Sequence, residues 1–375
     1  MLKFRFQNHL WHFIRFFLFQ FDPETTHSLA CFILRGLQVF KTRKRRTRIE
    51  LSGNSPQKKP LPPAPPTPSH PLTPHSPPSS HVLGLEFQSR VGLAAGFDKN
   101  AELLGALPSF GFGFAEVGTV TPRAQPGQNR PRLFRDVAHK SLLNRMGFNN
   151  QGALEVARNL ENTRPFLPAS FRVGVNIGKN KDTPLEEAHR DYVFSASLFK
   201  NLADYLVINV SSPNTPHLRL LQSTHFLKPL VQSVLEECAR HSPSRRTPPV
   251  LLKLSPDIHP QELESILIEA KTWGLGGWVL TNTLPGSLET ASGSFQGGWS
   301  GGRLTPLSQE KLKQVRSLSS LPIISVGGIL NTAEAQDRIQ MGADLIQIYT
   351  GWIYEGPFFP RQLSKALQKT SPSKN

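Results

Sequence analysis

The chain has 375 residues and a mass of 41.7 kDa, and 38% of its residues are apolar. This excludes a disordered chain and allows one large domain or two, each with a full hydrophobic core. The two cysteines, Cys31 and Cys238, exclude a disulfide scaffold and a cysteine-rich zinc site. A net charge of +16 indicates a polyanionic partner surface, either nucleic acid or anionic lipid.

Residues 1–40 are rich in aromatic side chains and contain nine of the 24 phenylalanines. Asp22-Pro23 is typical of a helix start and separates two segments with helical spacing of apolar residues, the second from Glu24 to Phe40. The uncharged stretch before Asp22 is too short to span a bilayer. We therefore predict a helical hairpin over 1–40 that lies on a membrane surface. The alternative is a hairpin that packs on the rest of the protein. The apolar residues with helical spacing in the first segment are Leu10, Phe13, Ile14, Phe17, Leu18 and Phe21.

The next segment, 41–81, is basic and then rich in proline. Six of the eight residues from Lys41 to Arg48 are basic, and 11 of the 33 prolines lie at 56–78. Such a composition cannot build a core, so we predict a disordered linker, whose basic run could contact anionic lipid headgroups. Residues 1–60 hold 12 Lys and Arg against three acidic residues, so most of the excess charge lies outside the remaining chain.

From residue 82 to 375, short apolar runs alternate with amphipathic stretches long enough to form helices. This pattern is typical of a parallel sheet, and eight such units favour a closed (β/α)8 TIM barrel over an open sheet. The expected strands are Val91–Ala95, Phe114–Thr121, Arg172–Ile177, Tyr205–Val210, Val250–Leu254, Trp278–Thr283, Ile323–Val326 and Leu345–Tyr349.

The carboxyl ends of these runs are polar or rich in glycine, and in a barrel all of them meet at one face, where such folds place their active sites. Asn144, Asn209, Asn214 and Asn282 offer paired donors and acceptors that suit a small planar heterocycle, and Lys99 could hold a carboxylate. A buried pocket is the simplest reason for so many amides beside apolar strands.

Two glycine-rich segments, 300–302 and 327–328, suit a phosphate cradle, although plain turns would also explain them. Ser211 and Ser212 are the candidates for proton chemistry at the fourth strand end, and either could be an ordinary turn residue. Gly298–Gly302 matches G-x-S-x-G, but it lies in a predicted loop and not at a strand-to-helix elbow, which argues against a hydrolase. No dinucleotide-binding glycine motif, P-loop or metal-ligand spacing is present.

Six strings resemble class 2 dihydroorotate dehydrogenases, the membrane-associated, quinone-reducing enzymes of pyrimidine synthesis. They are GLAAGFDK at 92–99, GTVTPR at 118–123, NRMGFN at 144–149, NIGKN at 176–180, NVSSPNT at 209–215 and ISVGG at 324–328. The resemblance covers about 10–40 and 82 to the C-terminus. It departs from the family at 300–304, where SGGRL replaces the common Ser-Gly-x-Pro-Leu, and in the longer basic and proline-rich segment.

The resemblance implies oxidation of dihydroorotate to orotate with FMN as prosthetic group. It implies that FMN is bound by Ala95, Gly96, Phe97, Asp98, Lys99, Thr119, Asn176, Asn209, Lys253, Thr281, Gly301, Gly328, Tyr349 and Thr350. It implies that dihydroorotate is bound by Lys99, Asn144, Arg145, Met146, Gly147, Phe148, Asn209, Asn214, Asn282 and Thr283.

The same resemblance makes Ser212 the base that removes the C5 proton while the C6 hydride passes to the flavin, and Lys253 a stabiliser of reduced flavin. Class 1 relatives have cysteine at the base position, whereas both cysteines of this chain lie elsewhere. His27 and Arg135 would line the quinone tunnel, and an exposed surface histidine is the alternative for His27.

We expect no metal, nucleic acid or obligate protein partner. The expected location is the cytoplasmic face of a bacterial cell membrane, with the mitochondrial inner membrane as the alternative, because the first helix leaves no room for a long transit peptide. Two other hypotheses remain open: an FMN barrel that acts on nucleic acid, such as a tRNA dihydrouridine synthase, and a non-catalytic lipid-bound scaffold.

Overall fold

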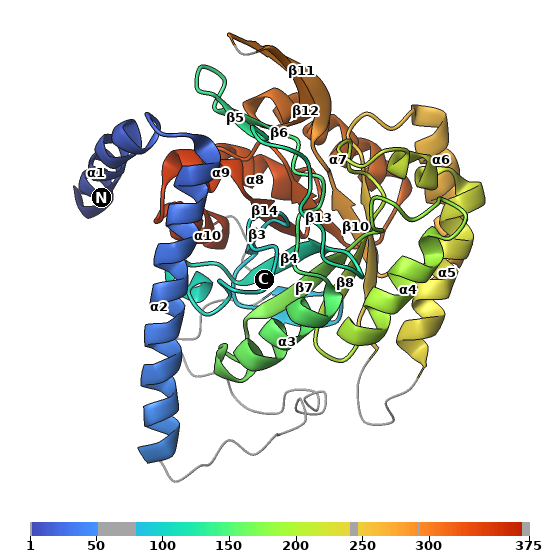
Figure 1. Ribbon diagram of the computed structural model, residues 1–375, viewed down its shortest axis with the longest axis horizontal. Coiled ribbons are helices and arrows are strands. Elements are labelled where there is room, and N and C mark those ends of the chain that lie inside the picture. Colours follow the sequence, from blue (N-terminus) through green and yellow to red (C-terminus); the bar gives the residue numbers. More distant parts are fainter. Residues whose placement is uncertain (1, 52–79, 241–246, 292, 370–375) are drawn as a thin grey trace.

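A closed barrel of eight parallel strands forms the centre of the protein (Figure 1). The computed structural model describes residues 2–51, 80–240, 247–291 and 293–369. The barrel strands are β3 (Val91–Leu93), β4 (Phe114–Val120), β7 (Arg172–Ile177), β8 (Tyr205–Asn209), β9 (Val250–Leu254), β10 (Gly277–Leu280), β13 (Ile323–Val326) and β14 (Leu345–Ile348). Each pairs in parallel with the next, and β14 closes onto β3. Seven of these strands lie within the predicted runs and β10 begins one residue before its run, at Gly277, so the TIM-barrel prediction is confirmed.

Helices cover the outside of the barrel. They are α3 (Ala153–Thr163), α4 (Ala188–Phe199), α5 (Thr224–Ala239), α6 (Pro260–Glu269), α7 (Thr305–Leu318), α8 (Thr332–Gln340), α9 (Thr350–Glu355) and α10 (Phe359–Lys369). Short 3₁₀ segments are η1 (Leu107–Phe110), η2 (Arg164–Phe166), η3 (Leu218–Gln222), η4 (Ala270–Thr272) and η5 (Gly302–Leu304). Alternating strands and helices bury the strands on both faces, which is why the strands read as continuous apolar runs.

The amino-terminal end of the barrel is closed by a small hairpin of β1 (Ser80–Val82) and β2 (Leu85–Phe87). Phe87 is fully buried. The centre of its ring lies 5.3 Å from that of Phe114, the first residue of β4. Tyr205 and Val207 of β8 belong to the same buried cluster inside the barrel. With this end closed, a ligand reaches the barrel interior from the carboxyl ends of the strands.

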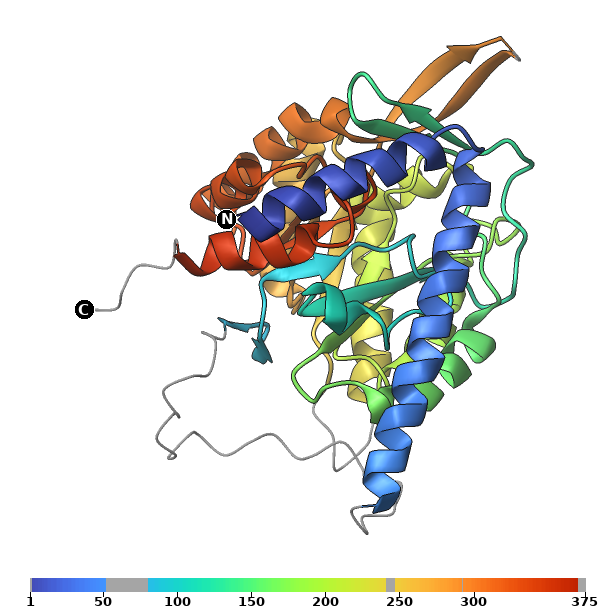
Figure 2. The same cartoon turned by 90° about the vertical axis from the view of Figure 1, so that its left-hand side faces the viewer.

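A four-stranded antiparallel sheet, which the sequence analysis did not predict, stands beside those carboxyl ends. Its strand order is β11 (Leu284–Thr290), β12 (Gly293–Gly301), β6 (Ser141–Asn144) and β5 (Leu133–Asp136). In Figures 1 and 2 the β11–β12 hairpin extends away from the barrel. The G-x-S-x-G segment therefore lies mostly on strand β12, and the prediction of a loop there is wrong.

Two helices precede the barrel, as predicted, but they do not pack as a hairpin. α1 (Leu2–Leu18) and α2 (Pro23–Leu51) leave the intervening turn in different directions (Figures 1 and 2). The predicted cap at Asp22 is present, because its Oδ1 accepts a hydrogen bond from the Thr25 amide at 2.9 Å.

The predicted boundaries of the linker at 41 and 81 are wrong. α2 continues through the basic run to Leu51, because Lys and Arg are good helix formers, and strand β1 begins at Ser80. Residues 52–79 lie outside the described residues, so the disordered linker stays a prediction there.

One face of the N-terminal helices packs on the barrel and the other carries exposed apolar side chains. The Trp11 indole donates to the Tyr354 carbonyl at 3.1 Å, which ties α1 to α9. Phe13 and Phe16 are each 64% exposed and Phe32 is 73% exposed. Within the described residues, no helix has both the length and the hydropathy needed to cross a membrane. Contacts with the barrel domain therefore bury only part of the apolar surface of these helices.

Candidate active site

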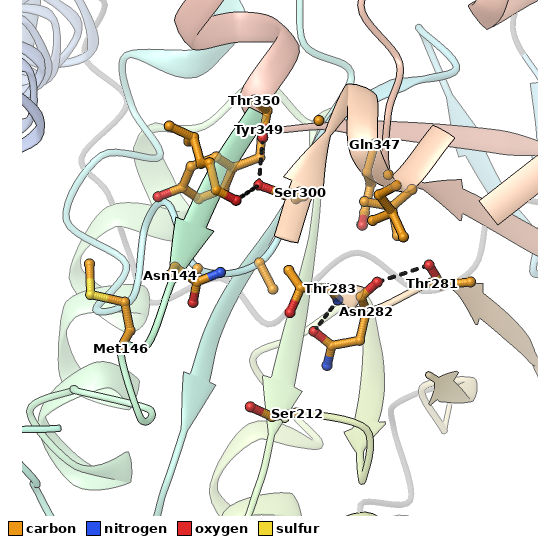
Figure 3. A pocket seen from close by; sticks show the side chains of 18 of the residues that line it. Asn144, Met146, Ser212, Thr281, Asn282, Thr283, Ser300, Gln347, Tyr349 and Thr350 are labelled. Atoms are coloured by element: carbon orange, nitrogen blue, oxygen red, sulfur yellow. Dashed lines mark hydrogen bonds between the residues drawn. The ribbon is translucent and has the colours of Figure 1, made fainter. Parts of the chain in front are cut away.

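A cavity lies at the carboxyl ends of the barrel strands, and Figure 3 shows side chains pointing into it from several of them. Most predicted site residues line it, namely Ala95, Gly96, Lys99, Thr119, Asn144, Met146, Gly147, Phe148, Asn209, Ser212, Asn214, Lys253, Thr281, Asn282, Thr283, Gly301, Gly328, Tyr349 and Thr350. The antiparallel sheet adds Leu133, Leu142 and Ser300 to the wall. The structure thus brings together in one pocket residues that are far apart in the sequence.

Four predicted ligand-binding residues lie outside this lining. The Phe97 ring packs against Tyr349 and Trp352, and the Asp98 carboxylate accepts hydrogen bonds from the amides of Glu102 and Leu103, both at 2.9 Å. The Arg145 side chain donates to Gln128 at 2.9 Å, and Asn176 is fully buried in the polar network beside the cavity. These side chains therefore lie beside the pocket lining, and their contacts with a ligand stay a prediction.

Amide side chains at the ends of neighbouring strands form one continuous network. Asn209 donates to Thr119 Oγ1 at 2.9 Å and to Asn176 Oδ1 at 3.0 Å. Asn282 donates to Asn209 Oδ1 at 3.1 Å and to Ser211 Oγ at 3.0 Å. Each amide is held by its neighbours, so donors and acceptors keep fixed positions in the cavity wall.

A second pair of amides stands nearer the antiparallel sheet. Asn214 donates to Asn144 Oδ1 at 3.1 Å, and Asn144 donates to the Gly298 carbonyl of β12 at 3.1 Å. This sheet therefore orients one of the predicted substrate ligands, although its strands were not predicted.

The structure gives the two candidate serines, Ser211 and Ser212, different surroundings. Ser211 is fully buried and its hydroxyl shares hydrogen bonds with Asn209 and Asn282. Ser212 lines the cavity, and its Oγ accepts a hydrogen bond from the backbone N–H of Asn214 at 3.2 Å. Among the described residues, the Ser212 hydroxyl has no acceptor for its own proton. Ser212 is therefore the serine that is free to exchange a proton with a ligand.

Two lysines bring positive charge to the cavity. Lys99 Nζ donates to the Gly96 carbonyl at 2.6 Å, and burial is the main cause that lowers its pKa. Lys253 Nζ lies 3.6 Å from the Glu116 carboxylate, which is fully buried in β4. Glu116 is not among the predicted site residues, although an acidic residue within an apolar strand is a usable signal for such a site.

Gln347 of β14 is a further cavity residue that the sequence analysis missed. Its Nε2 donates to Glu116 Oε2 at 2.7 Å, whereas its Oε1 is buried and has no hydrogen-bond partner among the described residues. A buried acceptor without a donor is costly, so this atom is suited to a ligand N–H group.

His27 and Arg135 lie outside the cavity lining, on the side of the N-terminal helices. The His27 ring meets the Phe97 ring at 4.8 Å, and burial lowers its pKa to about 3, which contradicts the alternative of an exposed surface histidine. Arg135 donates to the Phe21 carbonyl at 2.7 Å, and its guanidinium carbon lies 4.4 Å from the centre of the Phe19 ring. Phe97 contacts both His27 and Tyr349, so a chain of rings joins α2 to the cavity wall.

Comparison with known proteins identifies the family. The sequence model described as dihydroorotate dehydrogenase matches residues 79–370. The chain belongs to the dihydroorotate dehydrogenase family.

Several relatives of this family cover nearly the whole chain. A protein of Anaeromyxobacter dehalogenans named dihydroorotate dehydrogenase (quinone) is 39% identical over 96% of this chain and 92% of its own length. The protein of the same name from Thermus thermophilus is 41% identical over 94% of both chains. A crystal structure of the Eimeria tenella enzyme in complex with ferulenol is 31% identical, with a TM-score of 0.78 over 92% of this chain and 90% of that one. Of the hypotheses left open by the sequence, the comparisons support this oxidoreductase family.

A buried ion pair ties α2 to the wall of this dehydrogenase-family pocket. Arg132 donates to both Glu24 oxygens, at 2.8 to 3.2 Å, and both side chains are buried. Arg132 also holds the carbonyl of Gln128 at 3.1 Å, and the Gln128 side chain donates to the Asn214 carbonyl at 2.8 Å. Helix α2 and the pocket are thus joined through a continuous set of hydrogen bonds.

We expect Glu24→Gln to loosen this connection, because it leaves the Arg132 guanidinium buried without a carboxylate. The expected loss is about 3 kcal/mol of unfolding free energy, with faster amide hydrogen exchange in α2 and in residues 123–132. The matched control is Arg35→Gln, which breaks the more exposed pair between Arg35 of the same helix and Glu102 of the barrel domain and should cost less than about 1 kcal/mol. Equal effects of the two variants would contradict a special role for Glu24.

Proposed function

We propose that this protein oxidises dihydroorotate to orotate in pyrimidine synthesis, with FMN as prosthetic group and a membrane quinone as electron acceptor. The observation that carries the proposal is the cavity itself, where oriented amides stand near the Ser212 hydroxyl, whose hydrogen has no acceptor among the described residues. The names of the relatives support the substrate and the acceptor.

The residues present fit FMN. The Gln347 Oε1 acceptor suits the N–H edge of the flavin ring, and the Asn209 and Thr119 groups add polar partners. Gly301 has φ +83°, and a β-carbon there would collide with the Lys140 carbonyl, so only glycine allows this close approach of the backbone. The loops after the last two barrel strands, which hold Gly328 and Thr350, occupy the usual place of a phosphate in this fold.

When bound, FMN supplies two-electron chemistry between the substrate and the acceptor. Ser212 would accept the substrate proton, and Lys253 would stabilise negative charge beside it. Lys99 would bind the substrate carboxylate, while Asn144, Asn214 and Asn282 orient the ring. A serine is a weak base, so we infer that its proton passes on to water or to a hydrogen-bonded relay.

In this proposal the quinone reaches the protein on the side of the N-terminal helices. Their exposed phenylalanines suit the interface of a bilayer, where a lipid-soluble quinone resides. The side chains of His27 and Arg135, which lie where these helices contact the barrel domain, would line the path of the quinone. The proposed location is peripheral, on the cytoplasmic face of a bacterial cell membrane.

We expect the detergent-purified chain to be yellow and to lose its flavin absorbance when dihydroorotate is added without oxygen. The colour should return when a quinone is added, because the electrons then leave the flavin. The measurement is the visible spectrum at each step. A yellow protein that does not bleach would leave the barrel and cofactor in place and refute the substrate. A colourless protein would support a non-catalytic scaffold.

Ser212→Ala should slow flavin reduction by dihydroorotate at least about a hundredfold while FMN stays bound, because the proton acceptor is lost. Ser211→Ala is the matched control, since it removes the neighbouring hydroxyl that the Asn209 and Asn282 amides already occupy. Stopped-flow absorbance measures both rates. Unchanged reduction in Ser212→Ala would refute the assignment of the base.

Replacing Phe13, Phe16 and Phe32 together by serine should abolish binding to anionic vesicles and activity with a long-chain quinone. Activity with a water-soluble acceptor should persist, because the cavity is untouched. The control replaces two exposed apolar residues of the barrel helices, Leu154 at 62% and Ile268 at 56% exposure, by serine. Vesicle co-sedimentation and both assays give the readout, and equal losses in the control would refute a membrane surface at α1 and α2.

A further inference from the structure

Arg338 of α8 is a fully buried cation that the proposed reaction does not use. Its guanidinium donates to Ser308 Oγ at 2.6 Å, to the Gly327 carbonyl at 2.8 Å and to Ser325 Oγ at 3.2 Å. Burial lowers its pKa to about 10, so it stays charged at neutral pH. Among the side chains that the structure describes, no carboxylate lies within 4.0 Å of it. Glu334 and Asp337 attract this charge, but only from beyond ion-pair distance, and burial has the larger effect on its pKa. A buried charge without a paired carboxylate is costly, so its position needs a reason.

The hydrogen bonds of Arg338 fix the loop that follows β13. The Gly327 carbonyl accepts from both Arg338 and Ser308, the latter at 2.9 Å. In a planar trans peptide the next N–H points the opposite way, so the Gly328 amide is directed away from Arg338. The Gly328 carbonyl accepts from Thr305 Oγ1 at 2.9 Å, which directs the Ile329 amide away from Thr305 in the same manner.

The structure shows no acceptor for these two amides among the described residues. Gly328 and Ile329 both line the cavity, and neither N–H group has an acceptor within the part of the chain that the structure describes. Gly328 has φ +74°, and a β-carbon there would collide with Thr305, so the loop path requires glycine. Two unpartnered N–H groups that share a cavity wall are suited to an anion with several acceptor oxygens.

We propose that Arg338 is a positioning residue for the phosphate group of the bound cofactor. It holds the Gly327–Gly328 peptide so that the amides of Gly328 and Ile329 are available to the phosphate, whose charge balances the buried guanidinium. The inference rests on the proposed function, because FMN supplies the phosphate.

A purely structural role for Arg338 makes a different prediction. If Arg338 only supports the packing of α8, its loss would weaken the binding of any flavin equally. If it positions the phosphate cradle, its loss would weaken FMN and spare riboflavin, which has the same ring system but no phosphate.

The experiment measures the affinity of the full-length protein, freed of flavin in detergent, for FMN and for riboflavin by flavin fluorescence. Arg338→Met should weaken FMN binding at least about tenfold and riboflavin binding less than about twofold. Arg338→Lys should recover part of the FMN affinity, because it keeps the charge and one donor. The matched control is Arg316→Met, which also removes an arginine that holds backbone carbonyls, those of Gly342 and Ser319, and should change neither affinity.

Equal weakening of both flavins by Arg338→Met, or no weakening of FMN, would overturn the proposal. Thermal unfolding of each variant shows whether the barrel is intact. If Arg338→Met does not fold, Ser308→Ala removes the second donor to the Gly327 carbonyl and keeps Arg338. The preference for FMN over riboflavin should then fall in Ser308→Ala and in Arg338→Lys, and an unchanged preference in both would overturn the proposal. If the wild-type protein does not prefer FMN to riboflavin, the proposed cofactor is wrong and the inference falls with it.

Discussion

The Glu116 carboxylate joins four strands of the barrel beneath the cavity. One oxygen accepts from Asn176 of β7 at 2.7 Å and the other from Gln347 of β14 at 2.7 Å, while Lys253 of β9 lies 3.6 Å away. Because Glu116 occupies the Asn176 amide nitrogen, the Asn176 oxygen faces Thr119 and Asn209. The same constraint occupies the Gln347 amide nitrogen and leaves its oxygen without a hydrogen-bond partner among the described residues. The polarity of the pocket wall therefore follows from one buried carboxylate, which must be satisfied from all sides.

The barrel could be predicted from the sequence because strands buried on both faces must be apolar throughout. Their polar ends were visible for the same reason, since Asn209 or Lys253 beside an apolar run has no structural purpose in a core. The antiparallel sheet could not be predicted, because β5 and β6 are short and β12 is rich in glycine. The predicted helix ends too early because a run of Lys and Arg is typical of a solvated linker, although both residues also favour helices.

Side-chain direction was the other limit of the sequence. Phe97 and Asp98 lie in the same string as Gly96 and Lys99, yet Phe97 turns toward His27 and Asp98 toward two backbone amides. A string of residues at a strand end locates a site, but the turn geometry decides which side chains reach it. The roles of Glu116, Gln347 and Arg338 depend on contacts between strands and helices far apart in the sequence, and no local pattern contains that information.

The cations around the cavity differ in how their charge is balanced, and the difference indicates where ligands bind. Lys253 lies near Glu116, and Arg132 is paired with Glu24, so these charges are compensated within the protein. Lys99 and Arg338 have only carbonyl or hydroxyl partners among the described residues. A folded chain tolerates such cations where an anion completes the site. The proposed reaction supplies two anions, the carboxylate of the substrate for Lys99 and the phosphate of the cofactor for Arg338. Among the described residues the carboxylates that act on these two cations lie beyond ion-pair distance, so the two proposed anions would complete sites that the protein fills with hydrogen bonds alone.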